Sequence, residues 1–144
     1  RERENGCFVT DVWDDIRELT SGYFAGDEAI RNEKGERIHK QQSPISLLLR
    51  IILSSTKTGD SILDPFAGTG TTAIAAKQLM RNSLSFEIDR ENANRIENRL
   101  AVLRPADSIE KFFDKYRYTE NLAEIWGKSE SEKIENANRN FLAV

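Results

Sequence analysis

The sequence predicts an α/β domain built on a partial parallel sheet. Two strand-like segments, 61–63 and 83–88, are separated by a helical pattern over 71–80, and a second helical pattern follows Asp89. This strand–helix–strand–helix order builds a parallel sheet with helices packed on it. With 144 residues, 38% hydrophobic and 31% charged, the chain can form one ordinary domain with a strongly solvated surface.

The amino-terminal part predicts a strand, a short helical turn and a loop. Residues 7–12 are rich in β-branched and aromatic side chains, which favours a strand. Residues 13–19 could form a short helical turn. Residues 20–38 are polar and contain three glycines, which indicates a loop. The basic residues of this loop could contact phosphate, although a solvated loop is the simpler interpretation.

The next helix has a recognisable beginning and an apolar body. Ser43 and Pro44 predict an N-cap and a proline at the first helical position. The Leu/Ile run at 45–53 predicts a buried helix on the sheet. Within strand 83–88, apolar and polar residues alternate as they do in a strand.

The carboxyl-terminal part predicts helices. Asp89 is a candidate N-cap for a helix whose apolar stripe comprises Ala93, Ile96, Leu100 and Leu103. Asp107 and Glu110 have the spacing of a capping box. Behind them a second stripe comprises Ile109, Phe112, Phe113 and Tyr116. The sequence thus predicts a cofactor-binding part at 1–104 and a helical appendage at 105–144.

Composition excludes several kinds of protein. The net charge of −3 provides no overall positive field for nucleic acid. The single cysteine, Cys7, allows no internal disulfide, which fits a reducing, cytoplasmic compartment. One cysteine and one histidine cannot build a usual zinc site, so no metal is predicted. No apolar stretch approaches the roughly 20 residues of a membrane span.

The segment ILDPFAGTGTTAIAAKQL, residues 62–79, predicts a ligand-binding turn between a strand and a helix. Gly68 and Gly70 let the backbone turn tightly and approach a ligand closely. The amides at the start of the helix near Thr71 favour a negative group. Glu87 ends the next strand at the spacing of about 20 residues where such sites hydrogen-bond ribose hydroxyls. A nucleoside cofactor is therefore predicted across these strand ends.

The details of the turn favour S-adenosylmethionine over a phosphate ligand. No lysine follows Gly70, so the Walker pattern is absent, and Ala73 stands where a dinucleotide motif has its third glycine. The Asp64 carboxylate would repel phosphate but suits an ammonium. The amides of the turn suit the carboxylate of S-adenosylmethionine, Asp64 suits its amino group and Glu87 suits its ribose. A pyrophosphate cofactor remains a less favoured alternative.

The motif at Asp64–Thr72, D-P-F-A-G-T-G-T-T, resembles the cofactor motif of amino-group DNA methyltransferases. The segment 86–89, F-E-I-D, resembles the acidic strand end that binds ribose in this family, and residues 9–13 resemble the strand preceding its recognition segment. The resemblance spans about 7–103 and implies a Rossmann-like methyltransferase fold that uses S-adenosylmethionine.

A second motif, H-K-Q-Q-S-P, precedes the glycine turn and resembles the family's H-P-x-Q-K-P motif. His39, Gln42 and Pro44 match, whereas Lys40 replaces a proline and Ser43 replaces a lysine. This order of motifs implies the permuted group, in which the catalytic half precedes the cofactor half. The implied cofactor-binding residues are His39, Gln42, Ser43, Asp64, Pro65, Phe66, Ala67, Gly68, Thr69, Gly70, Thr71, Thr72 and Glu87.

The family's catalytic D-P-P-Y motif does not occur in this sequence, because no two of its three prolines are adjacent. In the permuted order that motif would lie before Arg1, so no catalytic residue is assigned here. The resemblance implies the carboxyl-terminal portion of a site-specific DNA methyltransferase of restriction-modification type, acting on adenine or cytosine. DNA would be bound through the whole enzyme, and the missing catalytic half would belong to the same longer chain or to a separate subunit. An exposed edge strand would also allow a homodimer.

Two alternatives to this function are considered. The first is a non-catalytic methyltransferase-like module for interaction or dimerisation, which the two replacements in the histidine motif favour and the intact turn and Glu87 disfavour. The second is a fragment of a nucleotide-dependent dehydrogenase, which Asp64 and the absent third glycine disfavour. The affinity for S-adenosylmethionine distinguishes the methyltransferase from the non-catalytic module. Competition by a dinucleotide tests the dehydrogenase fragment.

Overall fold

A computed structural model describes residues 10–19, 26–116, 119 and 141–143. Helices and strands follow the predicted order along the central part of the chain. The helices are α1 (Ile45–Ser55), α2 (Thr71–Gln78), α3 (Arg90–Ala101) and α4 (Phe113–Tyr116), and the strands are β1 (Ser61–Asp64), β2 (Asn82–Phe86) and β3 (Phe141–Ala143). Short 3₁₀ helices are η1 (Gly26–Glu28), η2 (Pro105–Asp107) and η3 (Glu110–Phe112).

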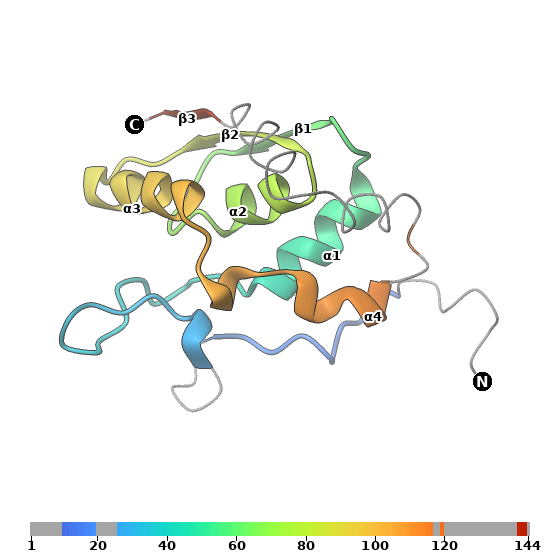
Figure 1. Ribbon diagram of the computed structural model, residues 1–144, viewed down its shortest axis with the longest axis horizontal. Helices are drawn as coiled ribbons and strands as arrows, with labels where there is room; N and C mark the ends of the chain where they lie inside the picture. The colour runs from blue at the N-terminus through green and yellow to red at the C-terminus, as the bar shows by residue number, and fades with distance from the viewer. Residues whose placement is uncertain (1–9, 20–25, 117–118, 120–140, 144) are drawn as a thin grey trace.

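The three strands form one parallel sheet in the order β1-β2-β3. The β1–β2 register pairs Ser61 with Asn82 and Asp64 with Ser85, so the two strands begin together and β2 extends one residue further, to Phe86. Helices α2 and α3 lie together against one side of the sheet, and α1 lies beyond α2 (Figure 1). The prediction of an α/β fold with a partial parallel sheet is therefore confirmed.

The core lies between α1, α2 and the sheet. Ile45 and Leu49 of α1 pack with Ile74 and Leu79, and all four are fully buried. Helix α2 has three buried alanines, whose small side chains let the helix approach its neighbours closely. Ile109, 3% exposed, joins the same cluster from the carboxyl-terminal segment.

Strand β2 buries its polar face and exposes its apolar face, which is the reverse of the usual arrangement of an alternating strand. Ser83 and Ser85 are buried on the side of α2, whereas Leu84 and Phe86 are 41% and 43% exposed. Leu63 of β1 is 63% exposed. Small serines leave room for α2 to pack closely, and no described residue buries the apolar side chains of the opposite face. The predicted strand itself is confirmed, but it ends at Phe86.

The amino-terminal predictions need correction. Residues 10–12 form no strand, because their backbone makes no ladder in the described part of the chain; residues 7–9 lie outside it. Residues 13–19 contain a turn at Asp14 and Asp15 but no helix. Local composition favoured regular structure there, but the described contacts of this segment with the body include those of the Asp15 carboxylate, which binds Arg50 and Lys115.

The beginning of α1 was also predicted incorrectly. The N-cap is Pro44, which has no side-chain hydrogen bond to offer, so Ser43 does not cap the helix. The Glu28 carboxylate instead accepts a hydrogen bond from the Ile45 amide. A residue distant in sequence therefore caps this helix. Helix α1 is not buried on all sides either, since Ile51 is 40% exposed.

The predicted capping box at Asp107 and Glu110 is wrong. Asp107 belongs to η2, and its carboxylate binds Arg99 and Arg104 instead of a helix amide. Asp89, in contrast, caps α3 as predicted by accepting a hydrogen bond from Asn92 N at 3.0 Å. Predictions for residues 121–126 and 129–140 lie outside the described residues, and the division into two domains stays a prediction. The expectation of an entirely helical segment 105–144 is wrong, because Phe141–Ala143 form β3 and pair with β2.

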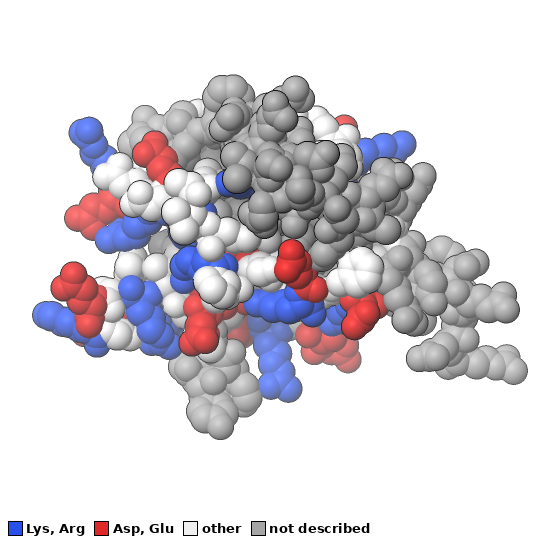
Figure 2. All heavy atoms as spheres, viewed as in Figure 1, with Lys and Arg blue, Asp and Glu red and all other residues white. Residues whose placement is uncertain are grey.

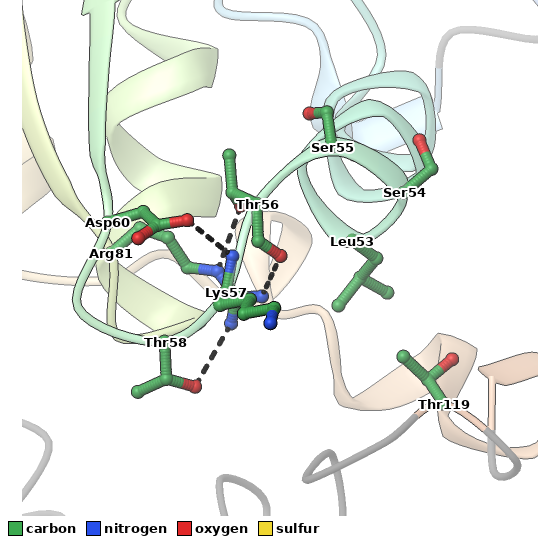
Figure 3. Close-up of a pocket in the computed structure, with 9 residues that line it drawn as sticks. All are labelled: Leu53, Ser54, Ser55, Thr56, Lys57, Thr58, Asp60, Arg81 and Thr119. Atoms are coloured by element: carbon green, nitrogen blue, oxygen red, sulfur yellow. Dashed lines mark hydrogen bonds between the residues drawn. The ribbon is translucent and has the colours of Figure 1, made fainter.

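A buried arginine stabilises the carboxyl ends of two helices. Arg81, 6% exposed, donates to the Thr56 carbonyl at 2.9 Å (Figure 3). It also donates to the Leu79 carbonyl at 2.6 Å. These carbonyls lie where helices α1 and α2 end and need external donors. Burial lowers the pKa of Arg81. The adjoining cleft of about 490 Å³ lies at the amino ends of the strands, away from the edge where α/β sheets bind ligands.

None of the helices in the described part of the chain has the length and apolar character needed to cross a bilayer.

Candidate cofactor-binding site

The turn between β1 and α2 requires glycine at two positions. Gly68 and Gly70 have φ values of +55° and +79°, in the left-handed region that glycine occupies without a steric penalty. A Cβ added to Gly70 would also lie 2.7 Å from Ile96 Cγ1 of α3. Gly70 N donates to the Ala67 carbonyl at 2.7 Å, which closes the turn. Conformation and packing together therefore explain the second glycine of the motif.

Glu87 joins this turn to the turn that follows β2. Its carboxylate accepts hydrogen bonds from Gly68 N at 2.7 Å and from Asp89 N at 2.8 Å. Ala67 N also donates to the Phe86 carbonyl at 2.9 Å, so both chain segments meet at the carboxyl ends of the strands. Each carboxylate oxygen has a second lone pair. Glu87 can therefore hold the turn and still accept hydrogen bonds from a ligand's hydroxyl groups.

His39 lies beside the same turn. A Cβ added to Gly68 would be 3.6 Å from His39 Nε2, so the missing side chain of Gly68 leaves space next to the imidazole. His39 Nδ1 is buried and has no hydrogen-bond partner among the described residues. A buried nitrogen without a partner is costly unless a ligand or water satisfies it.

These groups surround an open cleft of about 630 Å³. Phe66 and Ile88 present apolar side chains that are 88% and 98% exposed. An apolar rim with a few polar groups is typical of sites for small organic ligands. The cleft is lined by His39, Gln41, Pro65, Phe66, Gly68, Phe86, Glu87 and Ile88.

Three of these lining residues, Gln41, Phe86 and Ile88, were missed in the sequence. Phe86 and Ile88 flank Glu87, and their alternation with polar residues indicated an apolar face without showing that it stays exposed. Gln41 carries no local signal, because only the fold brings the segment after residue 38 to the turn.

Two predicted residues line a neighbouring cleft instead. Asp64 and Thr72 face a space of about 340 Å³ between α1 and β1. Asp64 Oδ1 also accepts a hydrogen bond from Phe66 N at 3.1 Å, which shapes the start of the turn. The structure thus distributes the predicted residues over two clefts on either side of the turn.

Gln42 and Ser43 have different surroundings from the cleft residues. Gln42, 5% exposed, accepts from Ile30 N at 2.9 Å and donates to the Glu28 carbonyl at 2.9 Å. Both ends of its amide therefore brace the preceding loop. Ser43 is exposed. Their contacts with a cofactor stay predictions.

The remaining predicted residues belong to the interior of the turn. Ala67, Thr69 and Thr71 are all buried, at 7%, 5% and 4% exposure. Thr71 Oγ1 has no hydrogen-bond partner among the described residues, and its residue begins α2. The first amides of α2 have no carbonyl partners inside the helix. This helix start can therefore donate hydrogen bonds to a carboxylate.

A buried ionic cluster supports the turn from behind, and sequence reasoning did not find it. Arg99 of α3 donates to the Thr69 carbonyl inside the turn. Its guanidinium also binds Asp107 at 2.9 Å, and Arg104 binds the same carboxylate at 2.6 Å. Asp107 is fully buried. Burial by itself raises the pKa of Asp107, but hydrogen bonds from Arg104 and Arg99 outweigh it and hold the pKa below its ordinary value.

The cluster extends to the start of α1. Arg104 donates to the Glu28 carbonyl at 3.0 Å, and the Glu28 carboxylate caps α1 at Ile45. Burial raises the pKa of Glu28. No local pattern in the sequence marks these contacts, because they join segments that are far apart in the chain.

The residues present fit S-adenosylmethionine. Glu87 can accept from ribose hydroxyls, and the free amides at the start of α2 can donate to a carboxylate. The space that Gly68 leaves beside His39 allows close approach to the backbone. Within the described residues, no group of three metal-ligating side chains gathers.

The chain belongs to the N6/N4 DNA methylase family, whose model matches residues 1–98. The predicted membership of the amino-group DNA methyltransferases is thereby confirmed. It is similar to the Type II methyltransferase M.HinfI of Haemophilus influenzae, with 45% identity over 80 residues, which cover 56% of this chain and 22% of that protein. It is also similar to the Type II methyltransferase M2.DpnII of Streptococcus pneumoniae, with 40% identity over 91 residues, which cover 63% of this chain and 30% of that protein. The matched region thus spans less than a third of each relative.

Proposed function

We propose that this chain is the S-adenosylmethionine-binding, carboxyl-terminal portion of a DNA methyltransferase that modifies the exocyclic amino group of adenine or cytosine. The observation that carries this proposal is Glu87, which bridges Gly68 and Asp89 on the rim of the cleft beside His39. Membership in the DNA methylase family supports the reaction class.

In this proposal the residues of the chain bind and orient the cofactor. Glu87 holds the ribose, the amides at the start of α2 hold the carboxylate, and Phe66 and Ile88 exclude water from the apolar part of the ligand. Asp64, in the neighbouring cleft, receives the amino group. Bound S-adenosylmethionine supplies an activated methyl group. Rate enhancement in such a site comes from positioning and electrostatic preorganisation.

The groups that clamp the target base lie outside this chain in our proposal. Enzymes that act on a base inside a duplex extrude it into a pocket, and the D-P-P-Y motif that serves this purpose in the family is absent here. The apolar face of Leu63, Leu84 and Phe86, which no described residue buries, supports a missing half, because parallel sheets are normally covered on both faces.

The test is calorimetric titration of the 144-residue chain with S-adenosylmethionine. We expect saturable binding that Glu87→Gln weakens about tenfold or more, since a hydrogen bond to a charged group contributes about 1.5–3 kcal/mol. Glu97→Gln is the matched control, because Glu97 is an exposed acid on α3 outside the cleft. Equal affinity of both variants would refute the role of Glu87.

The same titration separates the alternative functions. A folded chain with no affinity for S-adenosylmethionine would favour the non-catalytic interaction module. Displacement of S-adenosylmethionine by a dinucleotide at similar concentration would favour the dehydrogenase fragment. Sedimentation of the chain alone tests the proposed homodimer through an exposed edge strand: a dimer that forms with increasing concentration supports it, and a chain that stays monomeric contradicts it.

A further inference from the structure

Residues 30–38 form a small hairpin that is held by its own hydrogen bonds. Arg31 and Arg37 pair as an antiparallel bridge, and Ile38 N donates to the Ile30 carbonyl at 2.9 Å. At the tip, the Asn32 side-chain oxygen accepts from the amides of residues 34 and 36 at 3.0 and 2.9 Å. This segment is therefore preorganised, although the sequence alone predicted only a loop.

The base of the hairpin is fixed to the body beside the cofactor cleft. Gln42 holds Ile30 N, and Arg104 holds the Glu28 carbonyl. The residue that follows the hairpin is His39, whose ring lies next to Gly68 of the turn. The hairpin thus extends from the edge of the cleft, at the lower left of Figure 1.

The hairpin contributes little to the core, because residues 31–36 are all exposed. Its ordered hydrogen bonds thus shape a surface that projects into solvent. Residues 30–40 carry four basic and two acidic side chains, a net charge of +2 in a chain whose total is −3. Basic and acidic atoms lie together at this end of the molecule (Figure 2).

The charges of the hairpin favour an anionic partner. Arg31 and Arg37 pair across the bridge, where the Arg31 guanidinium donates to the Gly35 carbonyl at 2.9 Å and the Arg37 guanidinium donates to the Lys40 carbonyl at 3.3 Å. Of the two acids, Glu36 accepts from the Asn32 amide at 2.9 Å and so shapes the tip. Lys34 at the tip and Lys40 beyond the base are exposed and add positive charge. A phosphate that approaches this surface would meet more basic than acidic side chains.

We propose that the hairpin 30–38 and Lys40 contact the phosphate backbone of duplex DNA at the rim of the cofactor cleft. This inference rests on the proposed function, which requires the target base to reach the cleft. Contacts with phosphate position a duplex without reading its sequence. The hairpin would therefore fix the position of the duplex, while base recognition lies elsewhere in the whole enzyme.

The test is fluorescence anisotropy of a labelled 30-base-pair duplex titrated with the 144-residue chain over a series of salt concentrations. Lys34→Gln and Lys40→Gln are each expected to lower affinity on every duplex sequence and to reduce the slope of log K against log salt by about 1. Lys57→Gln, an exposed lysine at the opposite ends of the strands, removes the same charge and is expected to change neither quantity. Lys34→Arg keeps the charge and should retain binding.

The titration with S-adenosylmethionine on the same variants separates the two proposals. Unchanged cofactor affinity together with weakened DNA binding supports the hairpin contact and shows that the variants are folded. Unchanged DNA affinity and salt slope in both variants, or no DNA binding by the wild-type chain at low salt, would overturn the proposed DNA contact. Neither result would affect the proposed cofactor site. Equal losses in Lys57→Gln would also overturn it, because bulk charge would then explain the effect.

Discussion

The Asp107→Asn substitution tests whether the buried ionic cluster supports the glycine turn. The Asp107 carboxylate is fully buried and accepts two hydrogen bonds from each of Arg99 and Arg104, at 2.6–3.2 Å. An asparagine accepts with one oxygen only and turns an NH₂ group toward two guanidinium groups. The substitution therefore leaves buried positive charge without its counterion.

The expected cost follows from the geometry of this cluster. Removing one partner of a buried ion pair costs about 3–5 kcal/mol, a large share of the roughly 5–15 kcal/mol that stabilises a typical domain. Since urea slopes for small proteins are about 1–3 kcal/mol per molar, the unfolding midpoint should fall by about 2 M. Asp114→Asn, at an exposed aspartate of α4, is the matched control and should stay within about 0.5 kcal/mol of the wild type.

The pH dependence of stability gives a second measure of the same residue. The pKa of Asp107 is lower in the folded chain than its ordinary value of 3.8, because the hydrogen bonds from its two arginines outweigh the effect of burial. The contribution of the ionised Asp107 carboxylate to the free energy of unfolding is thus present above about pH 3.8. It is lost as the pH falls through the pKa that this group has in the folded chain. Urea midpoints between pH 7 and pH 3 should fall less steeply at the acid end in Asp107→Asn. A loss below about 1 kcal/mol at pH 7 would refute this reasoning.

Three further substitutions test other contacts, each by urea unfolding at pH 7. Gly70→Ala should cost about 1–3 kcal/mol, because the residue has a positive φ and its Cβ would lie 2.7 Å from Ile96; an unchanged midpoint would contradict the packing argument. Arg81→Met should cost about 1–3 kcal/mol, since two helix ends lose donors, and a neutral result would show that other groups satisfy those carbonyls. Asp15→Asn should cost only about 1 kcal/mol, because the carboxylate paired with Arg50 is 37% exposed, and a cost above 3 kcal/mol would show that solvent screens the pair less than its exposure suggests.

Several features were predictable because their signals are local. The glycines at 68 and 70 imply a tight turn, and Asp89 at the start of a periodic apolar stripe implies an N-cap. The alternation of strand 83–88 predicted β2 correctly apart from its bounds, which are Asn82 and Phe86. Each of these depends on the backbone preferences of residues adjacent in the chain, which is why the order of elements and the position of the turn were correct.

Other features failed because distant segments outweighed local preference. Ser43 is a good capping residue, yet the carboxylate of Glu28 occupies that role for Ile45. Asp107 matched a capping box by spacing, but burial with Arg99 and Arg104 made its carboxylate a counterion instead. A capping contribution of about 1 kcal/mol cannot compete with the cost of leaving two guanidinium groups unpaired.

The sequence by itself determined the class of fold, the family and the glycine turn with Glu87, because these depend on residue types at fixed short spacings. Only the tertiary structure decided which face of β2 is buried, that Gln42 braces a loop, and that Arg99 reaches the Thr69 carbonyl. Those outcomes depend on which surfaces meet in space and on the cost of burying polar groups without partners. The spacing of residue types along the chain does not predict these tertiary contacts.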